Sequence, residues 1–148
     1  MAGPLRGRSA ATAIRVLAFL VGIFFVALAV NKFAWLTDSG PLLRQFDAWD
    51  TNGSPASRWY LQVIARPGTP LFARLVPLAE CAAGVALMLG FWSRMVAGLA
   101  LVMVLNFHFA AASFWSWQFL RDGMGLPVIG ALLAIAIGGA QMPWTLRS

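Results

Sequence analysis

The stretch that decides the fold covers residues 71–114, LFARLVPLAECAAGVALMLGFWSRMVAGLALVMVLNFHFAAASF. It contains two apolar runs, 71–89 and 95–114, and each has about the 20 residues that an α-helix needs to cross a bilayer. Between them lie only Gly90 and the segment 91–94, a link too short to join anything but antiparallel neighbours. The stretch therefore predicts a helical hairpin within the membrane.

Two further apolar runs, 14–35 and 126–142, flank this hairpin. A cleavable signal peptide is the competing interpretation of the first run, because arginines precede it and Ala27-Leu28-Ala29 has the small-x-small form of a cleavage site. The run continues past that triplet, so we expect a helix that is retained. The sequence thus predicts an all-α protein, a single membrane domain over residues 1–148 built as an integral four-helix bundle.

The composition agrees with a membrane location. Of the 148 residues, 60% are hydrophobic and 11% charged, and the mean hydropathy is +0.76, so the chain cannot cover itself with polar surface in water. The net charge of +6 reflects a shortage of acids, five against eleven basic residues, and the arginines stand singly at the ends of apolar runs. This pattern is typical of anchoring at lipid headgroups, so we expect the bilayer as a partner and no nucleic acid.

The chain has one cysteine, Cys81, and one histidine, His108. It therefore cannot form an intramolecular disulfide, nor a standard zinc or iron–sulfur site from its own side chains. We predict no metal site made by the protein alone, and metal chemistry would need a borrowed cofactor.

The segment 37–70 between the first two helices is too long to be structureless in so small a protein. It predicts two short amphipathic pieces, the second beginning at Ser54-Pro55 with an N-cap followed by proline at the first helical position. The apolar faces consist of Leu42, Leu43, Phe46 and Trp49 in the first piece and Trp59, Tyr60, Val63 and Ile64 in the second. Two interpretations stay open: a lid on the bundle or in the headgroup layer, or the roof of a ligand cleft or docking surface for a soluble partner.

The orientation follows from the first helix. Arg6, Arg8 and Arg15 precede or open it, which favours both termini and the 90–94 turn in the cytoplasm, with the loop 37–70 outside.

Glu80 is the most informative residue, because it lies about ten residues from either end of its run and so near the middle of the hydrocarbon. A carboxylate there costs several kcal/mol unless it is paired or protonated, so we expect it to face the interior. Two interpretations stay open: a protonated carboxyl joining helices by a hydrogen bond, or a contact to a proton path, a quinone or another cofactor.

His108 lies about 20 Å from the inner surface and Glu80 about 15 Å, a mismatch of one helical turn. A Glu80–His108 hydrogen bond is therefore expected if both point inward. His108 has three further interpretations: a satisfied buried histidine, a hydrogen bond to a quinone carbonyl, or the axial ligand of a heme or chlorophyll-type macrocycle. Asn106 lies at a similar depth on another side of the same helix.

Four cations lie near the helix ends: Arg15, Lys32, Arg74 and Arg94. We interpret them as interface anchors that snorkel to the headgroups. Lys32 can instead turn inward toward an anion or carboxylate. Small residues at helix-packing spacing, Ala79 and Ala83 in one run and Gly130, Ala134 and Gly138 in another, predict close helix contacts or an oligomer.

Together these motifs resemble a known family. Arg15, Gly22 and Asn31-Lys32 in the first helix are followed by Pro77-x-x-Glu80 with Gly84, by the segment 89–94 (Leu-Gly-Phe-Trp-Ser-Arg), and by His108 with Phe114. In order and spacing, over nearly the whole chain, this is similar to the DoxX family of small four-helix bacterial membrane proteins. The chain departs from the family at 125–127 and 138–140, which lack the acidic residue entering the fourth helix and the Gly-Pro-Gly-like exit with a final Asp.

The resemblance implies an integral subunit of a quinone-linked or redox complex in the bacterial cytoplasmic membrane, such as the small subunit of a thiosulfate:quinone oxidoreductase. We expect a subunit that is non-catalytic or weakly catalytic, with other protein subunits or further copies of itself as partners and quinone as the candidate cofactor. Glu80 and His108 are the candidate acid and its partner, while Arg15, Lys32, Arg94 and Asn106 are candidate positioning or ligand-binding residues. The alternative is an accessory subunit of a large bioenergetic assembly, either structural or associated with a pigment (chlorophyll, heme or carotenoid), in which His108 is a candidate ligand of a porphyrin or chlorophyll.

Overall fold

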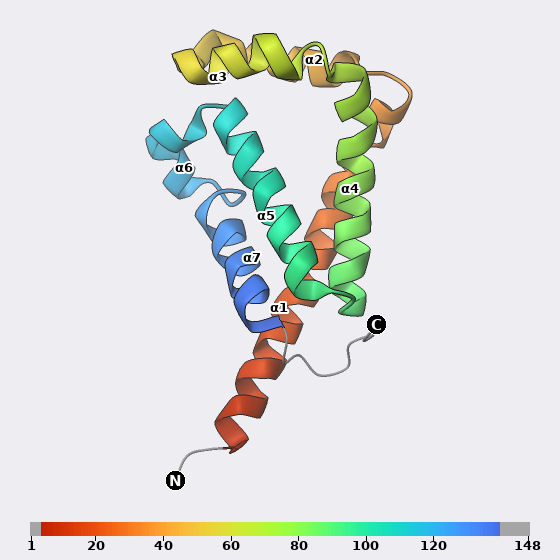
Figure 1. Cartoon of the computed structure of the whole chain (residues 1–148), viewed down its shortest axis with the longest axis vertical. Helices are drawn as coiled ribbons and strands as arrows, with labels where there is room; N and C mark the ends of the chain where they lie inside the picture. The colour runs from red at the N-terminus through yellow and green to blue at the C-terminus, as the bar shows by residue number, and fades with distance from the viewer. Residues whose placement is uncertain (1–3, 140–148) are drawn as a thin grey trace.

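The computed structural model describes residues 4–139, and these residues form helices joined by turns, without any strand (Figure 1). The four helices of the bundle are α1 (Pro4–Asn31), α4 (Thr69–Leu89), α5 (Ser93–Ala110) and α7 (Leu126–Gly138). Shorter elements complete the chain: η1 (Phe33–Leu36), α2 (Gly40–Asn52), α3 (Pro55–Tyr60), η2 (Leu61–Ala65), η3 (Ser113–Trp115) and α6 (Trp117–Arg121). The prediction of an all-α, helical membrane bundle is confirmed.

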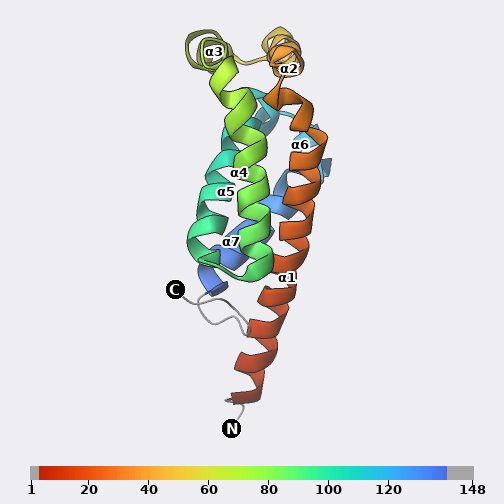
Figure 2. The same cartoon turned by 90° about the vertical axis from the view of Figure 1, so that its right-hand side faces the viewer.

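The bundle is held by three helix contacts: α1 packs along α4, α7 packs along α5, and α7 also contacts α1. Helices α4 and α5 are the predicted antiparallel hairpin, and the turn between them uses left-handed backbone at Gly90 (φ 74°) and Trp92 (φ 43°). The start of α1, this turn and the end of α7 lie at one end of the bundle, and α2 and α3 lie across the other (Figures 1 and 2).

Glycines set the α1–α4 contact. A Cβ atom built on Gly84 would lie 2.7 Å from the Gly22 carbonyl oxygen, and one on Gly22 would lie 2.6 Å from the Gly84 carbonyl oxygen. Side chains at either position would collide with backbone, so only two glycines allow the helices to approach this closely. In Figure 2, α1 and α4 run side by side along most of the bundle.

The boundaries of the first and third helices in the structure differ from the predicted ones. Helix α1 begins at Pro4, ten residues before the predicted 14–35 segment, and it ends at Asn31 with a separate 3-10 turn after Lys32. Helix α5 ends at Ala110 rather than Phe114, because the chain reverses through left-handed backbone at Ala112 (φ 53°). Hydropathy alone does not mark these ends, since the residues beyond them remain apolar.

Within residues 4–139, three helices are long and apolar enough to cross a membrane: the Arg8–Asn31 part of α1, α4 and α5. The fourth, α7, is apolar but has 13 described residues. The predicted span 126–142 extends past it, and residues 140–142 lie outside the described residues. The outer faces of all four helices carry exposed large apolar side chains, as expected of helices that contact lipid.

The segment between α1 and α4 forms a roof over one end of the bundle, which we define as α2, α3 and η2. Its predicted start signal is confirmed, since the Ser54 hydroxyl accepts a hydrogen bond from the Ser57 amide at 3.2 Å and Pro55 is the first helical residue. In the first piece Leu42 and Phe46 are buried. In the second piece, the face that packs inward is Ser57, Leu61 and Ala65, whereas Trp59, Val63 and Ile64 are exposed.

Candidate functional site

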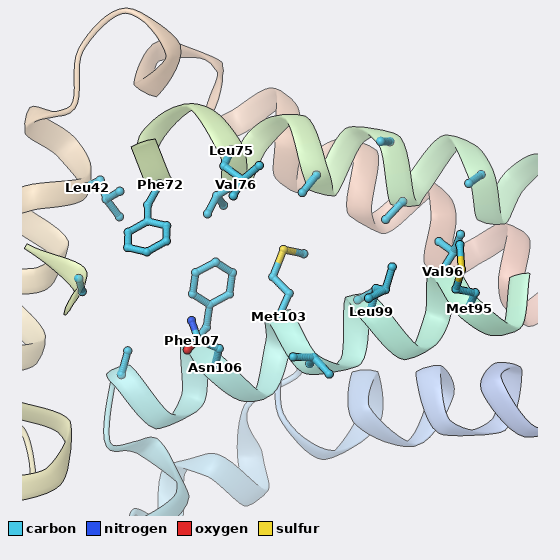
Figure 3. A pocket seen from close by; sticks show the side chains of 18 of the residues that line it. Leu42, Phe72, Leu75, Val76, Met95, Val96, Leu99, Met103, Asn106 and Phe107 are labelled. Atoms are coloured by element: carbon cyan, nitrogen blue, oxygen red, sulfur yellow. The ribbon is translucent and has the colours of Figure 1, made fainter. Parts of the chain in front are cut away.

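A groove runs between α4 and α5 (Figure 3). It has a volume of about 780 Å³, within the range of roughly 300–1,000 Å³ found for small-molecule sites. It exists because the hairpin helices are drawn apart: α4 follows α1 through the glycine contact and α5 packs on α7, so α4 and α5 themselves touch little. The space between α4 and α5 is therefore not filled by direct packing of the two helices, and it forms the groove.

Small side chains on α4 widen this gap. Ala79, Ala82, Ala83 and Ala86 all line the groove. The sequence predicted a close helix contact or an oligomer at Ala79 and Ala83. Both residues line the groove and Ala83 also packs against the buried core, whereas the closest approach of α4 to α1 is made by Gly84 on another side of the helix. Spacing alone does not reveal which small residues meet a neighbour, because that depends on the rotation of the helix.

The roof closes one end of the groove. Leu42, Phe46 and Trp49 of α2 line that end. The roof is tied to the bundle by the buried Ser57 hydroxyl, which donates to the Ala110 carbonyl at the end of α5 at 2.5 Å. The segment 37–70 thus lies as a roof over one end of the groove.

An ion-pair cluster holds the two parts of the roof together. Arg66 contacts Asp47 at 2.8 Å and Asp50 at 3.1 Å, which joins the end of η2 to α2. The sequence pattern does not reveal this cluster, because its residues are separated by a turn and show no helical spacing.

Asn106 is one of the few groove-lining side chains with a polar group, together with Tyr60, Trp49 and Trp92. Among the described residues, no charged side chain lines the groove. In Figure 3, Phe72 and Phe107 face each other across the groove near the roof, with Asn106 beside Phe107. Asn106 thus lies at the groove, and its role as a ligand-binding residue stays a prediction. The two phenylalanines were missed because aromatic residues are common throughout the chain.

Glu80 is buried, with 2% of its side chain exposed, and it forms an ion pair with Lys32 through Oε1. Its Oε2 atom has no hydrogen-bond partner within the described part of the chain. Lys32 is 20% exposed and turns inward from the end of α1, so its interpretation as a headgroup anchor is wrong. Lys32 directly follows the last residue of α1, and its long side chain reaches Glu80 on α4.

The Lys32–Glu80 pair lies beside the groove. The Lys32 Nζ atom is 5.6 Å from the centre of the Phe107 ring and 5.7 Å from that of Trp35, at cation–π distance from both. Phe107 lines the groove, and so do Val76, Ala79 and Ala83, the neighbours of Glu80 on α4. A charged pair in the membrane interior thus lies close to residues that line the groove.

His108 does not meet Glu80. Its Nδ1 atom lies 2.7 Å from the Ser113 hydroxyl and its Nε2 atom lies 3.0 Å from the Met124 carbonyl oxygen. Its ring also contacts Phe114 and Phe119. The expected Glu80–His108 hydrogen bond is therefore absent, and both ring nitrogens of His108 have partners that tie the end of α5 to the connection before α7.

Arg15 and Arg94, which were interpreted as headgroup anchors, donate hydrogen bonds to the ends of other helices. Arg15 donates to the carbonyl oxygens of Leu87 at 3.2 Å and Met88 at 2.5 Å, and Arg94 donates to that of Ala136 at 3.0 Å. The last carbonyls of a helix have no partner within it and carry partial negative charge, so each guanidinium caps the end of a neighbouring helix. Both arginines position helices and lie away from the groove.

The described residues contain no group of three or more histidine, cysteine, aspartate or glutamate side chains that could hold a metal ion. The prediction of no protein-made metal site concerned the whole chain and remains a prediction.

Comparison with known proteins identifies one relationship. A family model described as DoxX matches residues 11–113, more than half of the chain. The match covers α1 from residue 11 onward, the roof, α4 and α5, and it ends before α7. No curated protein and no solved structure shows a significant match.

Proposed function

The chain belongs to the DoxX family of membrane proteins, and from this premise we propose that it is an integral subunit of a redox complex that binds a quinone from the bilayer in the groove between α4 and α5. The family is often linked to oxidoreductase-related function, and the chain is a multi-pass membrane protein. A partner subunit would supply the redox centre, and the chain would anchor it at the bacterial cytoplasmic membrane with both termini inside.

The groove is the observation that carries this proposal. Its wall is almost wholly apolar and it lies between two membrane-spanning helices, so a hydrophobic molecule can reach it without leaving the lipid. Its volume of about 780 Å³ fits a substituted quinone ring with the first part of its chain, since sites for molecules of this size fall in the range of roughly 300–1,000 Å³. The buried Lys32–Glu80 pair adds charge near the groove that can influence the protonation of a ligand there.

No observation favours the alternative of a pigment-binding accessory subunit. Ligation of a porphyrin or chlorophyll, the form of that alternative which involves this chain's own side chains, would need a free nitrogen on His108. Both nitrogens hydrogen-bond instead, and His108 is buried beside Phe114 and Phe119 rather than facing the groove.

The proposal is tested by gentle purification into nanodiscs, followed by an optical spectrum and mass spectrometry of co-purifying lipids and proteins. We expect a colourless preparation that carries quinone and an oxidoreductase subunit. A groove-filling variant, Ala82→Phe, is compared with Val85→Phe, whose site on the same helix is also exposed but lies outside the groove lining. Quinone should be lost only in Ala82→Phe. Equal quinone content in both variants, or a pigment band in the wild type, would overturn the proposal.

A further inference from the structure

The groove differs along its length. Three of its polar-capable side chains, Trp49, Tyr60 and Asn106, come from the roof or the adjoining part of α5. The wall that continues toward the α4–α5 turn is aliphatic, with Ala82, Ala83, Val96, Leu99 and Ala100. At the far end Trp92 stacks on Phe91, with ring centres 5.2 Å apart and an angle of 8° between the planes.

The roof end of the groove carries an opposed pair of aromatic side chains. Phe72 and Phe107 face each other across the groove there, with the Asn106 amide beside Phe107 (Figure 3). Aromatic pairs favour stacked or edge-on arrangements, so a planar ring between the two phenyl groups would contact both. An amide can donate a hydrogen bond to a carbonyl oxygen, the polar group that a quinone ring carries.

The charges around the groove restrict the ligand further. Among the described residues, no Lys or Arg lines it. The nearby cations have other partners, since Lys32 is paired with Glu80 and Arg66 with Asp47 and Asp50. A phosphate headgroup would lose its hydration here without a compensating cation, which costs several kcal/mol or more. The groove therefore favours an uncharged head and disfavours a phospholipid.

The groove is longer than a single ring. Its lining on α5 runs from Met95 to Ala110, which at about 1.5 Å per residue is about 22 Å. The roof closes the end near Asn106 through the Ser57 to Ala110 hydrogen bond. A chain attached to a ring at that end can therefore extend only toward the turn and outward between the helices.

We propose that the groove binds an uncharged quinone in one orientation, with the ring under the roof between Phe72 and Phe107, a carbonyl oxygen accepting from the Asn106 amide, and the chain extending toward Met95. This inference rests on the proposed function and adds the position, polarity and a specificity-determining residue. Asn106 is exposed on the groove side of α5, so it can meet a ligand without a change of fold.

Photolabelling in phosphatidylcholine nanodiscs tests the orientation. Two decyl-benzoquinone probes are used, one with a diazirine on the ring and one with a diazirine at the end of the chain, and labelled peptides are mapped by mass spectrometry. We expect the ring probe to label the roof, Phe72 and 106–107, and the chain probe to label 92–99. Unlabelled decyl-benzoquinone should compete with both probes, and added phosphatidylglycerol should not.

The reversed pattern would overturn the orientation but leave the quinone site in place. Labelling that unlabelled quinone fails to reduce would overturn the proposed function itself. Asn106→Leu should weaken binding about tenfold, the factor that one ordinary hydrogen bond supplies. The matched control is Gln62→Leu, an amide to leucine change at an exposed roof position outside the groove, which should leave binding unchanged. Equal affinity of both variants would remove Asn106 from the site.

Discussion

Replacing Lys32 by methionine tests the energetic role of the buried ion pair. The variant leaves Glu80 with 2% of its side chain exposed and without its cation. Removing one partner of a buried pair costs about 3–5 kcal/mol, because the other charge stays behind uncompensated. We therefore expect Lys32→Met to lower the free energy of unfolding by about 3–5 kcal/mol, measured by denaturant titration in mixed micelles.

The two partners should respond unequally. Lys32 is 20% exposed at the end of α1 and can turn to the headgroups once it is unpaired, whereas Glu80 cannot reach water. Glu80→Gln should therefore cost less, about 1–2 kcal/mol, because it leaves mainly unsatisfied hydrogen bonds. The double variant Lys32→Met with Glu80→Leu should recover most of the wild-type stability, since apolar replacement of a whole buried pair is often neutral.

Arg74→Met is the matched control, because Arg74 is an exposed cation of α4 that donates to the Pro70 carbonyl of its own helix. It should change stability by less than about 1 kcal/mol. If Lys32→Met cost no more than Arg74→Met, the burial argument for the pair would be wrong. The quinone content of the stable double variant then distinguishes a purely structural pair from one that also affects quinone binding. If the pair is purely structural, the quinone content should be unchanged.

Three further predictions concern packing and caps. Gly84→Ala should destabilise the protein by about 1–3 kcal/mol through overpacking, while Gly98→Ala, with no atom within 4 Å of the new Cβ, should be neutral or slightly stabilising in the same titration. His108→Ala should cost about 1–3 kcal/mol and speed hydrogen–deuterium exchange in the connection after α5, because it removes two hydrogen bonds; unchanged exchange there would contradict this. Arg15→Met should cost about 1–2 kcal/mol by uncapping α4, and the exposed Arg8→Met should not, so equal thermal stability of the two variants would count against a capping role.

The sequence was sufficient to predict those structural features that depend only on neighbouring residues. An apolar run long enough to cross a bilayer forms a helix because no water is present to satisfy its backbone, and a link as short as 90–94 leaves only an antiparallel arrangement. The cap at Ser54-Pro55 follows equally from neighbouring residues. The helical membrane bundle and its family could therefore be predicted, and both are confirmed.

The partners of the polar side chains depend on the register and rotation of each helix relative to its neighbours, which the sequence of one helix does not determine. Glu80 was correctly expected to face the interior, but its partner is Lys32, and His108 binds the connection before α7 instead. The contact of Gly22 with Gly84 fixes the register and rotation of α1 on α4, and it brings Lys32 within reach of Glu80.

The same contact decides where the groove lies. With α4 held against α1 and α5 held against α7, the alanines of α4 face a space rather than a helix. Composition and helical period thus determined that this chain is a helical membrane protein with a costly buried acid. Which charge compensates that acid, and where a ligand can enter, was decided only by tertiary packing, because rotation and register are properties of helix pairs.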